Sequence, residues 1–397
     1  MQTILFDSDV RTDLLPLTYA RPVAGLRCGI LTTAEAWAHR LGGVVSVLTQ
    51  DYLQPDYPLS ITDDNLFIDG SLRPSVELVS FARQAKLNTA YVEGGEPLVM
   101  RLDQNHAERF VAAADLTGIA RTEMPHLPLL RVRRPADLFL HNAEALRSDF
   151  EVITAGRTSA PLSATNTLIG PADQLFIEEG VTLEACTINV TTGPVYIGSR
   201  AVVLEGCLLR GPIAACAGAV LKMGTKIYGA TTLGPTCKVG GEINNVVMQA
   251  HSNKGHEGFL GNAAVGEWCN IGADTNASNL RNDYGEVKVW SYRSGQREPS
   301  GLQFHGLVLG DHCKVGINTM FNTGTVVGFS ANVFGAGFPP AFVPSFSWGG
   351  GEGLTTYRPE RAVATAERMY ERRGRVFGAR ERAIFERIFA DSARYRD

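Results

Sequence analysis

The chain has 397 residues, a formal net charge of −4 and 20% charged residues. This length predicts two domains, or a domain plus a solenoid, rather than one compact core. The near-neutral charge gives no reason to expect nucleic acid or a membrane surface as a partner. No signal peptide and no membrane-spanning run of roughly 18 apolar residues is recognisable. Seven cysteines without a C-x-x-C pair favour a reducing compartment, so we expect a cytoplasmic protein.

Residues 1–165 alternate strand-like and helical stretches. Strands are expected at Thr3–Phe6, Val44–Thr49, Asn65–Ile68 and Thr89–Val92, and helices at Leu31–Leu41, Ser75–Lys86 and Ala136–Phe150. This alternation is typical of an α/β layer fold with a mainly parallel sheet. Ligands of such folds bind beyond the carboxyl ends of the strands, which are followed here by loops such as Asp7–Asp13 and Asp69–Pro74.

Residues 166–345 carry a repeat in which apolar or small residues recur at every sixth position. Its longest register is Ile197, Val203, Leu209, Ala215, Leu221, Ile227, Leu233 and Val239. The step returns at Val265 and Ile271, and again from Leu309 to Val333. A period of six fits neither an α-helix nor a heptad. It fits short strands around a triangular solenoid, with one residue per side pointing to the axis.

Two polar segments, Glu242–Ala264 and Asn276–Phe304, interrupt the register. A solenoid accommodates insertions as loops at its corners, and such loops often form a binding face. Both segments flank the Val265–Ile271 coil, so we expect them to meet in space. Residues 346–397 are expected to form a loop and a basic helical tail from about Arg358 to Ala393.

The solenoid resembles the left-handed β-helix of hexapeptide-repeat acyltransferases. The segment Lys254-Gly255-His256-Glu257-Gly258-Phe259-Leu260-Gly261-Asn262, then Asn270-Ile271-Gly272-Ala273 and Asn279, is similar to the acetyltransferase half of the bifunctional glucosamine-1-phosphate acetyltransferase / N-acetylglucosamine-1-phosphate uridyltransferase family. The resemblance implies an α/β nucleotidyltransferase-like domain, a left-handed parallel β-helix of hexapeptide repeats and a C-terminal helix. It also implies a homotrimer with acetyl-CoA bound between neighbouring solenoids.

The resemblance implies that His256 is the catalytic base. Acetyl transfer from a thioester to a sugar amine requires that the amine lose a proton, which an imidazole can accept near neutral pH. Positioned general-base catalysis contributes about 10²–10⁴-fold in rate. By the same resemblance, Asn270 and Asn279 line the sugar or thioester site, where an Asn amide can stabilise an oxyanion.

Further residues are candidates for binding the substrate. Phe259 stands where the family has a Tyr. Lys226 and Asn244 stand where the family has two basic residues that hold the sugar phosphate, so one of those charges is retained. Lys254 or Lys288 is a candidate to replace the other.

The first domain matches part of the family's phosphate-binding pattern. Arg11 and Pro16-Leu17-Thr18 agree with it, whereas the preceding glycines are missing and Val23 stands where the Lys belongs. Arg21 or Arg27 is expected to supply the missing cation for the nucleotide phosphates.

The resemblance also implies a Mg²⁺ site in this domain. Asp69 ends a strand where the family places a metal-binding Asp, and Asn142 falls near its second metal-proximal motif. Mg²⁺ is commonly held by one or two carboxylates together with substrate phosphates.

The leading hypothesis is therefore a bifunctional enzyme that acts on a sugar phosphate and a nucleoside triphosphate. It would acetylate glucosamine-1-phosphate from acetyl-CoA and then couple the product to UTP. One alternative is a nucleotidyltransferase for another sugar 1-phosphate, of the glucose-1-phosphate thymidylyltransferase type, with the β-helix as a scaffold. A second alternative is a non-catalytic trimeric protein that binds sugar nucleotides.

Overall fold

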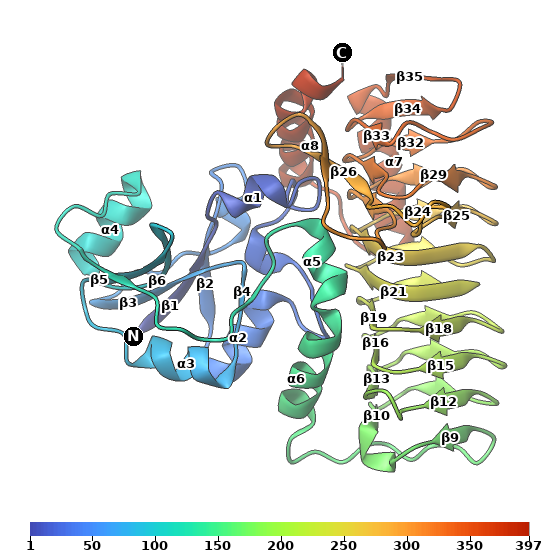
Figure 1. The fold of residues 1–397 in the computed structure, drawn as a ribbon, viewed down its shortest axis with the longest axis horizontal. Coiled ribbons are helices and arrows are strands. Elements are labelled where there is room, and N and C mark those ends of the chain that lie inside the picture. The colour runs from blue at the N-terminus through green and yellow to red at the C-terminus, as the bar shows by residue number, and fades with distance from the viewer. Residues whose placement is uncertain (397) are drawn as a thin grey trace. The chain divides into compact units, whose positions relative to one another are not determined.

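A computed structural model describes residues 1–396 (Figure 1). The chain forms two compact units that are not contiguous in sequence. The first comprises Met1–Leu14, Arg21–Leu26 and Leu31–Arg133, and the second comprises Leu15–Ala20, Arg27–Ile30 and the chain from Arg134 onward. Residues 134–165, which were expected with the first domain, therefore belong to the second unit.

The first unit is built on one six-stranded sheet. In spatial order its strands are β2 (Val45–Leu48), β1 (Gln2–Phe6), β3 (Asp64–Asp69), β6 (Glu96–Asp103), β5 (Thr89–Glu93) and β7 (Ala120–Glu123). Strands β1, β2 and β3 are parallel, but β6 is antiparallel to both β3 and β5. The sheet is thus mixed: β5 pairs with β7 in parallel, so three of its five strand pairs are parallel as expected, whereas β6 is antiparallel to its neighbours because β5 and β6 form a hairpin through Gly94 and Gly95, both of which have positive φ.

Helices cover both faces of this sheet. Helix α2 (Thr33–Leu41) begins with a capping box between Thr32 and Glu35, and Ser75 caps α3 (Val76–Arg83). Both pack on one face, while α4 (Gln104–Ala113) packs on the other. The unit also contains α1 (Val10–Asp13) and a two-stranded ribbon of β4 (Leu72–Arg73) and β8 (Leu130–Arg131).

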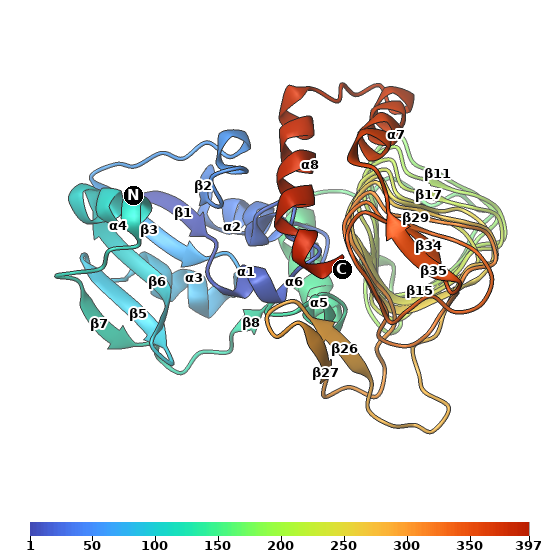
Figure 2. The same cartoon turned by 90° about the horizontal axis from the view of Figure 1, so that it is seen from above.

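The second unit contains a parallel β-solenoid with three faces, whose coils lie over one another when viewed end-on (Figure 2). Face I consists of β10 (Leu175–Ile177), β13 (Val195–Ile197), β16 (Ile213–Ala215), β19 (Thr231–Leu233), the C-terminal halves of β21 (Glu242–Met248) and β23 (Phe259–Val265), β28 (Val308–Leu309), β31 (Val326–Val327) and β33 (Phe342–Val343). Face II consists of β11 (Thr182–Leu183), β14 (Val202–Val203), β17 (Val220–Leu221), β20 (Lys238–Val239), β22 (Asn253–Lys254), β24 (Asn270–Ile271), β29 (Lys314–Val315), β32 (Asn332–Val333), β34 (Ser347–Gly350) and β35 (Gly353–Thr356). Face III consists of β9 (Thr167–Ile169), β12 (Thr187–Asn189), β15 (Leu208–Arg210), β18 (Lys226–Tyr228), the N-terminal halves of β21 and β23, β25 (Asn276–Ala277) and β30 (Met320–Phe321).

The sixfold register corresponds to the solenoid axis. Every residue of the longest predicted register is buried in one continuous apolar core. Neighbouring coils are paired so that these residues stack on one another, as Leu209 does on Ile227. The prediction of a solenoid with one inward residue per side is therefore confirmed.

The two interruptions differ in kind. Glu242–Ala264 is not a loop, because β21 pairs with β18 and β19, and β23 continues that pairing without a break. The sixfold step is lost there because the corners between strands are shorter. Asn276–Phe304, by contrast, contains a true insertion between β25 and β28, which folds into a hairpin of β26 (Lys288–Ser291) and β27 (Gln296–Pro299).

Four helices complete the second unit. The helix expected at Ala136–Phe150 is two helices, α5 (Pro135–Leu140) and α6 (Asn142–Thr154). The expected tail helix is likewise two, α7 (Pro359–Arg372) and α8 (Ala379–Asp391), because the chain turns at Gly374, which has a φ of 67°. Short 3₁₀ turns occur in both units, at Val23–Gly25, Gln54–Asp56, Ala172–Gln174 and Ala393–Tyr395. Within residues 1–396, no helix combines the length and the apolar character that a bilayer crossing requires.

Candidate functional site

His256 lies on an exposed turn between β22 on face II and β23 on face III. Gly258 allows this turn to lie close to the next coil, because it has a φ of +111° and a Cβ there would approach the Thr275 carbonyl oxygen to 2.2 Å. The backbone amide of Phe259 ends the turn by donating to Asn276 Oδ1 at 2.8 Å. The histidine is thus accessible on a turn whose backbone is held from the neighbouring coil.

The turn is also held from inside the solenoid by Lys254. This lysine pairs in register with Val239, so it occupies an axial position, and it is 1% exposed. Its Nζ donates to the carbonyl oxygens of Gly240, His256 and Glu257 at 3.2, 2.9 and 3.2 Å. Burial lowers the pKa of Lys254 to about 8. The predicted contact of Lys254 with a substrate phosphate does not fit this geometry, because its ammonium faces three backbone carbonyls.

Phe259 and Asn279 lie together on the face III side of the turn. A Cβ on Gly261 would meet the Phe259 ring at 2.5 Å and the Asn279 amide nitrogen at 2.7 Å, so both side chains cover this glycine. Asn279 Nδ2 donates to Asn262 Oδ1 at 2.7 Å. The two polar segments therefore meet in space, as their positions in the sequence predict.

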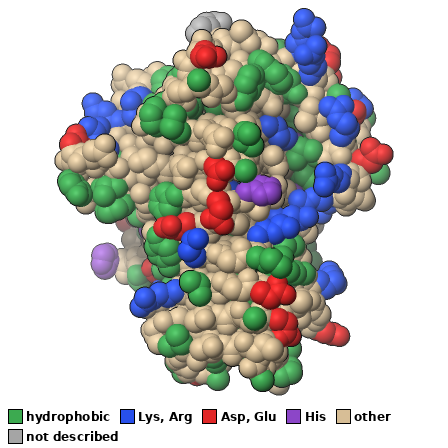
Figure 3. Space-filling model, turned by 90° about the vertical axis from the view of Figure 1, so that its right-hand side faces the viewer, with side chains coloured by type: hydrophobic (Ala, Val, Ile, Leu, Met, Phe, Trp, Pro, Cys, Tyr) green, Lys and Arg blue, Asp and Glu red, His purple; other side chains and the backbone are tan. Residues whose placement is uncertain are grey.

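Lys226 belongs to the same face. It is in register with Glu242, which is in register with Phe259. Its Nζ lies 3.8 Å from the Glu257 carboxylate, with 44% of the lysine side chain exposed. Such an exposed pair binds weakly, so Lys226 can exchange this partner for a phosphate. Figure 3 shows that the charged side chains on one side of the solenoid form small groups on a largely uncharged surface.

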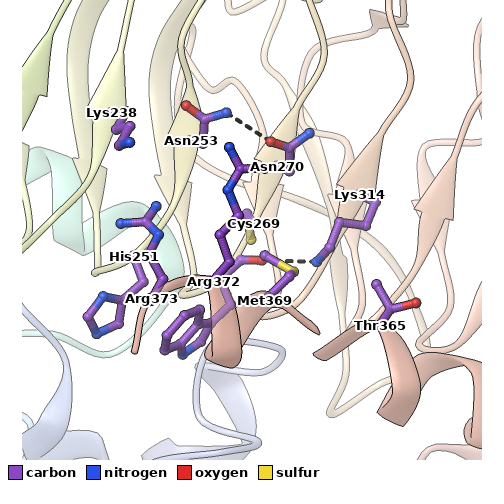
Figure 4. A pocket seen from close by; sticks show the side chains of 11 residues that line it. Lys238, His251, Asn253, Cys269, Asn270, Lys314, Thr365, Met369, Arg372 and Arg373 are labelled. Atoms are coloured by element: carbon purple, nitrogen blue, oxygen red, sulfur yellow. Dashed lines mark hydrogen bonds between the residues drawn. The ribbon is translucent and has the colours of Figure 1, made fainter. Parts of the chain in front are cut away.

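Asn270 is placed differently. It lies on face II, where its Oδ1 accepts from Asn253 Nδ2 at 2.8 Å. Both asparagines line a cavity of about 300 Å³ (Figure 4). Of the predicted substrate-binding residues, Lys226, Phe259 and Asn279 therefore share face III, whereas Asn270 belongs to the neighbouring face.

In the first unit, polar side chains gather where the strands β1, β2 and β3 end. Asp7 follows β1, Thr49 follows β2, and Asp69 is the last residue of β3. Asp7 accepts from the Val23 amide at 2.8 Å and from Thr49 Oγ1 at 2.6 Å. Asp69 accepts from the Ser71 amide at 2.8 Å and from the Arg131 guanidinium at 3.2 Å.

Arg11, a residue predicted to bind the nucleotide, joins this cluster. Its Nε lies 3.5 Å from the Asp7 carboxylate, and its Nη2 donates to the Tyr52 hydroxyl at 2.7 Å. Burial, with a smaller contribution from the Asp69 charge, raises the pKa of Asp7 to about 6. A carboxyl group with a strongly shifted pKa at a strand end is typical of a functional site. Neither Asp7 nor Arg131 is among the site residues predicted from the sequence, although Asp7 follows an apolar strand just as Asp69 ends one.

Three predicted residues of the nucleotide and metal site lie elsewhere or are buried. Arg21 belongs to the first unit and is 6% exposed. Arg27 belongs to the second unit, where its guanidinium donates to the Ile30 carbonyl and its backbone amide and carbonyl both bind the Gln249 side chain. This buried setting gives Arg27 a structural role.

Asn142 also belongs to the second unit and is fully buried. Its Oδ1 accepts from the Gly29 amide at 2.8 Å and from Thr232 Oγ1 at 3.0 Å, and its Nδ2 donates to the Ala230 carbonyl at 2.9 Å. Because two donors already occupy its oxygen, the geometry favours a structural role over metal binding. Among residues 1–396, no group of three or more His, Cys, Asp or Glu side chains could hold a metal ion.

Comparison with known proteins finds similarities for both parts of the chain. Residues 3–158 match a family model described as sugar nucleotidyl transferase. The chain is 24% identical over 314 residues to the bifunctional protein GlmU of Geotalea uraniireducens, covering 72% of this chain and 64% of that protein. It is 33% identical over 93 residues to the bifunctional sugar-1-phosphate nucleotidylyltransferase/acetyltransferase of Sulfurisphaera tokodaii, covering 23% of each chain.

Among solved structures, the polySia-specific acetyltransferase NeuO is matched with a TM-score of 0.29 and 12% identity, over 53% of this chain and 94% of that chain. The chain spans less than two thirds of the length of the curated relatives described above. Both parts of the chain are thus similar to transferases: residues 3–158 match the sugar nucleotidyl transferase model, and the chain is distantly similar to proteins described as bifunctional nucleotidylyltransferase/acetyltransferases.

Proposed function

We propose that the solenoid transfers an acetyl group from acetyl-CoA to the amine of glucosamine-1-phosphate, with His256 as the general base. The observation that carries the proposal is the exposed His256 turn, which Lys254 pins from within and which adjoins Lys226, Phe259 and Asn279 on one side. The related proteins described as acetyltransferases give the reaction class.

In the proposed reaction the amine nitrogen attacks the thioester carbonyl carbon. As the C–N bond forms, the His256 imidazole accepts a proton from the amine. The C–S bond then breaks, and the protonated His256 returns this proton to the departing sulfur, so that CoA leaves as its thiol and the imidazole is restored. A backbone N–H or the side-chain amide of Asn279 would stabilise the oxyanion. Lys226 would bind the sugar phosphate, giving up its weak contact with Glu257.

We further propose that the first unit couples the sugar phosphate to UTP. Asp7, Asp69 and Arg11 would form its site at the carboxyl ends of the parallel strands, where ligands of such sheets bind. Asp7 and Asp69 lie at neighbouring strand ends, and two carboxylates together with substrate phosphates are a donor set that suits Mg²⁺. When bound, Mg²⁺ would neutralise phosphate charge. Arg11 would orient the phosphates.

A pair of assays tests the two activities separately. Release of thiol from acetyl-CoA in the presence of glucosamine-1-phosphate should fall by about 10²–10⁴-fold in His256→Ala. The matched control is His126→Ala, which removes another exposed histidine. Undiminished acetyl transfer in His256→Ala would refute the assignment of the base.

Release of pyrophosphate from UTP and N-acetylglucosamine-1-phosphate should be lost in Asp69→Asn and retained in His256→Ala. Loss of both activities in both variants would contradict the proposed division of labour. The family resemblance further supports a homotrimer, and sedimentation equilibrium of the full chain should give three times the monomer mass. A monomer at all concentrations would contradict this assembly.

A further inference from the structure

The cavity on face II is lined on one side by a row of polar residues. Lys238, Asn253, Asn270 and Lys314 occupy equivalent positions in four successive coils and are paired in register. We call this row the face II ladder. Its outward side chains replace the apolar residues that occupy the same position in earlier coils, such as Val220, which pairs with Lys238. The ladder is thus polar where the two preceding coils carry Val202 and Val220.

Helix α7 forms the opposite side of the cavity. Its Tyr370 ring stacks on Trp268 with the centroids 4.1 Å apart, and Trp268 stacks on His251 at 4.3 Å. Beyond the end of the helix, Arg373 Nη1 donates to the Thr236 carbonyl at 3.1 Å. These contacts fix α7 against face II and bring Arg372 and Arg373 to the cavity, as Figure 4 shows.

The cavity concentrates positive charge. Lys238, Arg372 and Arg373 line it, and none of its lining residues within 1–396 is an Asp or Glu. Lys314 also lines it, but its ammonium already donates to the carbonyl oxygens of Trp268 and His312 at 3.0 and 2.6 Å. The pKa of Lys238 is lowered, first by burial and then by the charges of Arg373, Lys222 and Arg372. Cations that repel one another in a recess without a carboxylate are stabilised when an anion enters.

The shape and the donors of the cavity indicate the kind of anion. Guanidinium groups bind phosphate oxygens in a bidentate manner, and a lysine adds a point charge. The Asn253 and Asn270 amides, joined by one hydrogen bond, supply neutral donors beside the charges. A volume of about 300 Å³ is at the small end of ligand pockets, so it suits part of a small molecule rather than a polymer.

We propose that the cavity between the face II ladder and α7 binds a phosphate or diphosphate group carried by a small molecule. Lys238, Arg372 and Arg373 provide the charge, and the two asparagines orient the ligand. This site gives the basic tail helix a role that acetyl transfer at His256 does not assign to it. Phosphate-bearing thioester cofactors, nucleotides and sugar phosphates share this chemistry.

The direct test is calorimetric titration of the full chain with inorganic pyrophosphate. Saturable binding is expected, and it should weaken as the salt concentration rises. Arg372→Gln and Lys238→Gln should each raise the Kd at least about tenfold, which is ~1.4 kcal/mol. Arg361→Gln is the matched control, because this arginine is exposed on the same helix but does not line the cavity. Absence of binding at millimolar pyrophosphate, or equal Kd values in all variants, would overturn the proposal.

Displacement of pyrophosphate identifies the source of the phosphate group. CoA is compared with pantetheine, UDP with uridine, and glucosamine-1-phosphate with glucosamine, so that in each pair only the first compound carries phosphate. A phosphorylated compound that displaces pyrophosphate while its partner does not is the class of ligand, and failure of all three would overturn the proposal. His256→Ala should keep pyrophosphate binding, so the failure of acetyl transfer and the failure of this site can be told apart.

Discussion

Replacing Lys254 with Met removes the ammonium that holds the His256 turn. Three hydrogen bonds from a charged donor to backbone carbonyls are lost, each worth about 1.5–3 kcal/mol, so the loss is at least about 5 kcal/mol. Burying the charged ammonium costs the native protein free energy, and the Met variant avoids this cost. The lowering of the Lys254 pKa from 10.5 to about 8 puts the cost at about 3 kcal/mol. We therefore expect Lys254→Met to lower the free energy of unfolding at pH 7 by about 2 kcal/mol.

The difference between the two proteins should depend on pH. Between pH 8 and 10.5 the unfolded lysine binds more protons than the folded one, so the native protein gains stability as pH rises through this window. The Met variant lacks this gain. The gap in free energy of unfolding, measured by urea denaturation, should accordingly widen by up to about 3 kcal/mol between pH 7.5 and 10.

Lys226→Met is the control for this measurement, because Lys226 is 44% exposed and its ion pair is worth no more than about 1 kcal/mol. Lys254→Met should also reduce kcat for acetyl transfer at temperatures where the variant is folded, because the His256 turn loses its anchor. A stability gap that stays constant with pH would refute the reasoning about the buried ammonium.

Two further predictions concern the first unit and the segment that leads into the solenoid. Because the pKa of Asp7 is raised from 3.8 to about 6, the native protein should lose about 3 kcal/mol of stability as pH rises through this window. Asp7→Asn should abolish this loss. Urea denaturation at pH 4 and pH 7 measures it, and an unchanged pH dependence would contradict the assignment. Asn142→Ala should cost roughly 2–5 kcal/mol, since the Gly29 amide and Ala230 carbonyl lose their buried partner, whereas Glu144→Ala on the exposed side of α6 should change little. Thermal unfolding measures both, and a small effect of Asn142→Ala together with altered Mg²⁺ dependence would instead support a metal role.

The solenoid could be predicted from the sequence because every coil repeats the same local environment. One inward residue per side must be apolar, so the register of buried residues is visible as a period of six. Lys254 occupies such an inward position, and because it is charged, its coil does not show the apolar period of six. The shorter corners around β21 also break this period. The pairing of β21 with β18 and β19 continues regardless, because backbone hydrogen bonding does not depend on the inward side chain.

The departures in the first unit have a similar origin. A mainly parallel sheet was expected because strands and helices alternate, and three of its five strand pairs are parallel. The strand β6 follows β5 through a Gly94-Gly95 turn, and two glycines are typical of a tight hairpin, so the sheet is mixed.

Other features depend on contacts between residues far apart in sequence. Arg27 and Gln249 are separated by 222 positions, and no local pattern in either segment indicates that they bind one another. The same is true of the cavity on face II, whose two sides come from the solenoid and from α7. The His256 motif was recognisable because its residues lie within a few coils of one another. Asp7 and Arg131 are far apart in sequence, and their positions follow from the order of the strands.

The division of the chain into two units has a consequence for how the protein can fold and be dissected. Leu15–Ala20 and Arg27–Ile30 belong to the solenoid unit, although they are made long before any solenoid strand. During synthesis the Arg27–Ile30 segment must wait for Gln249 and Thr232, which bind the backbone of Arg27 and Gly29, to leave the ribosome. A fragment that starts at Arg134 would expose the solenoid surface that this segment covers. Neither unit can therefore be obtained intact by a single cut, and the chain is expected to complete its folding only after the solenoid has been synthesised.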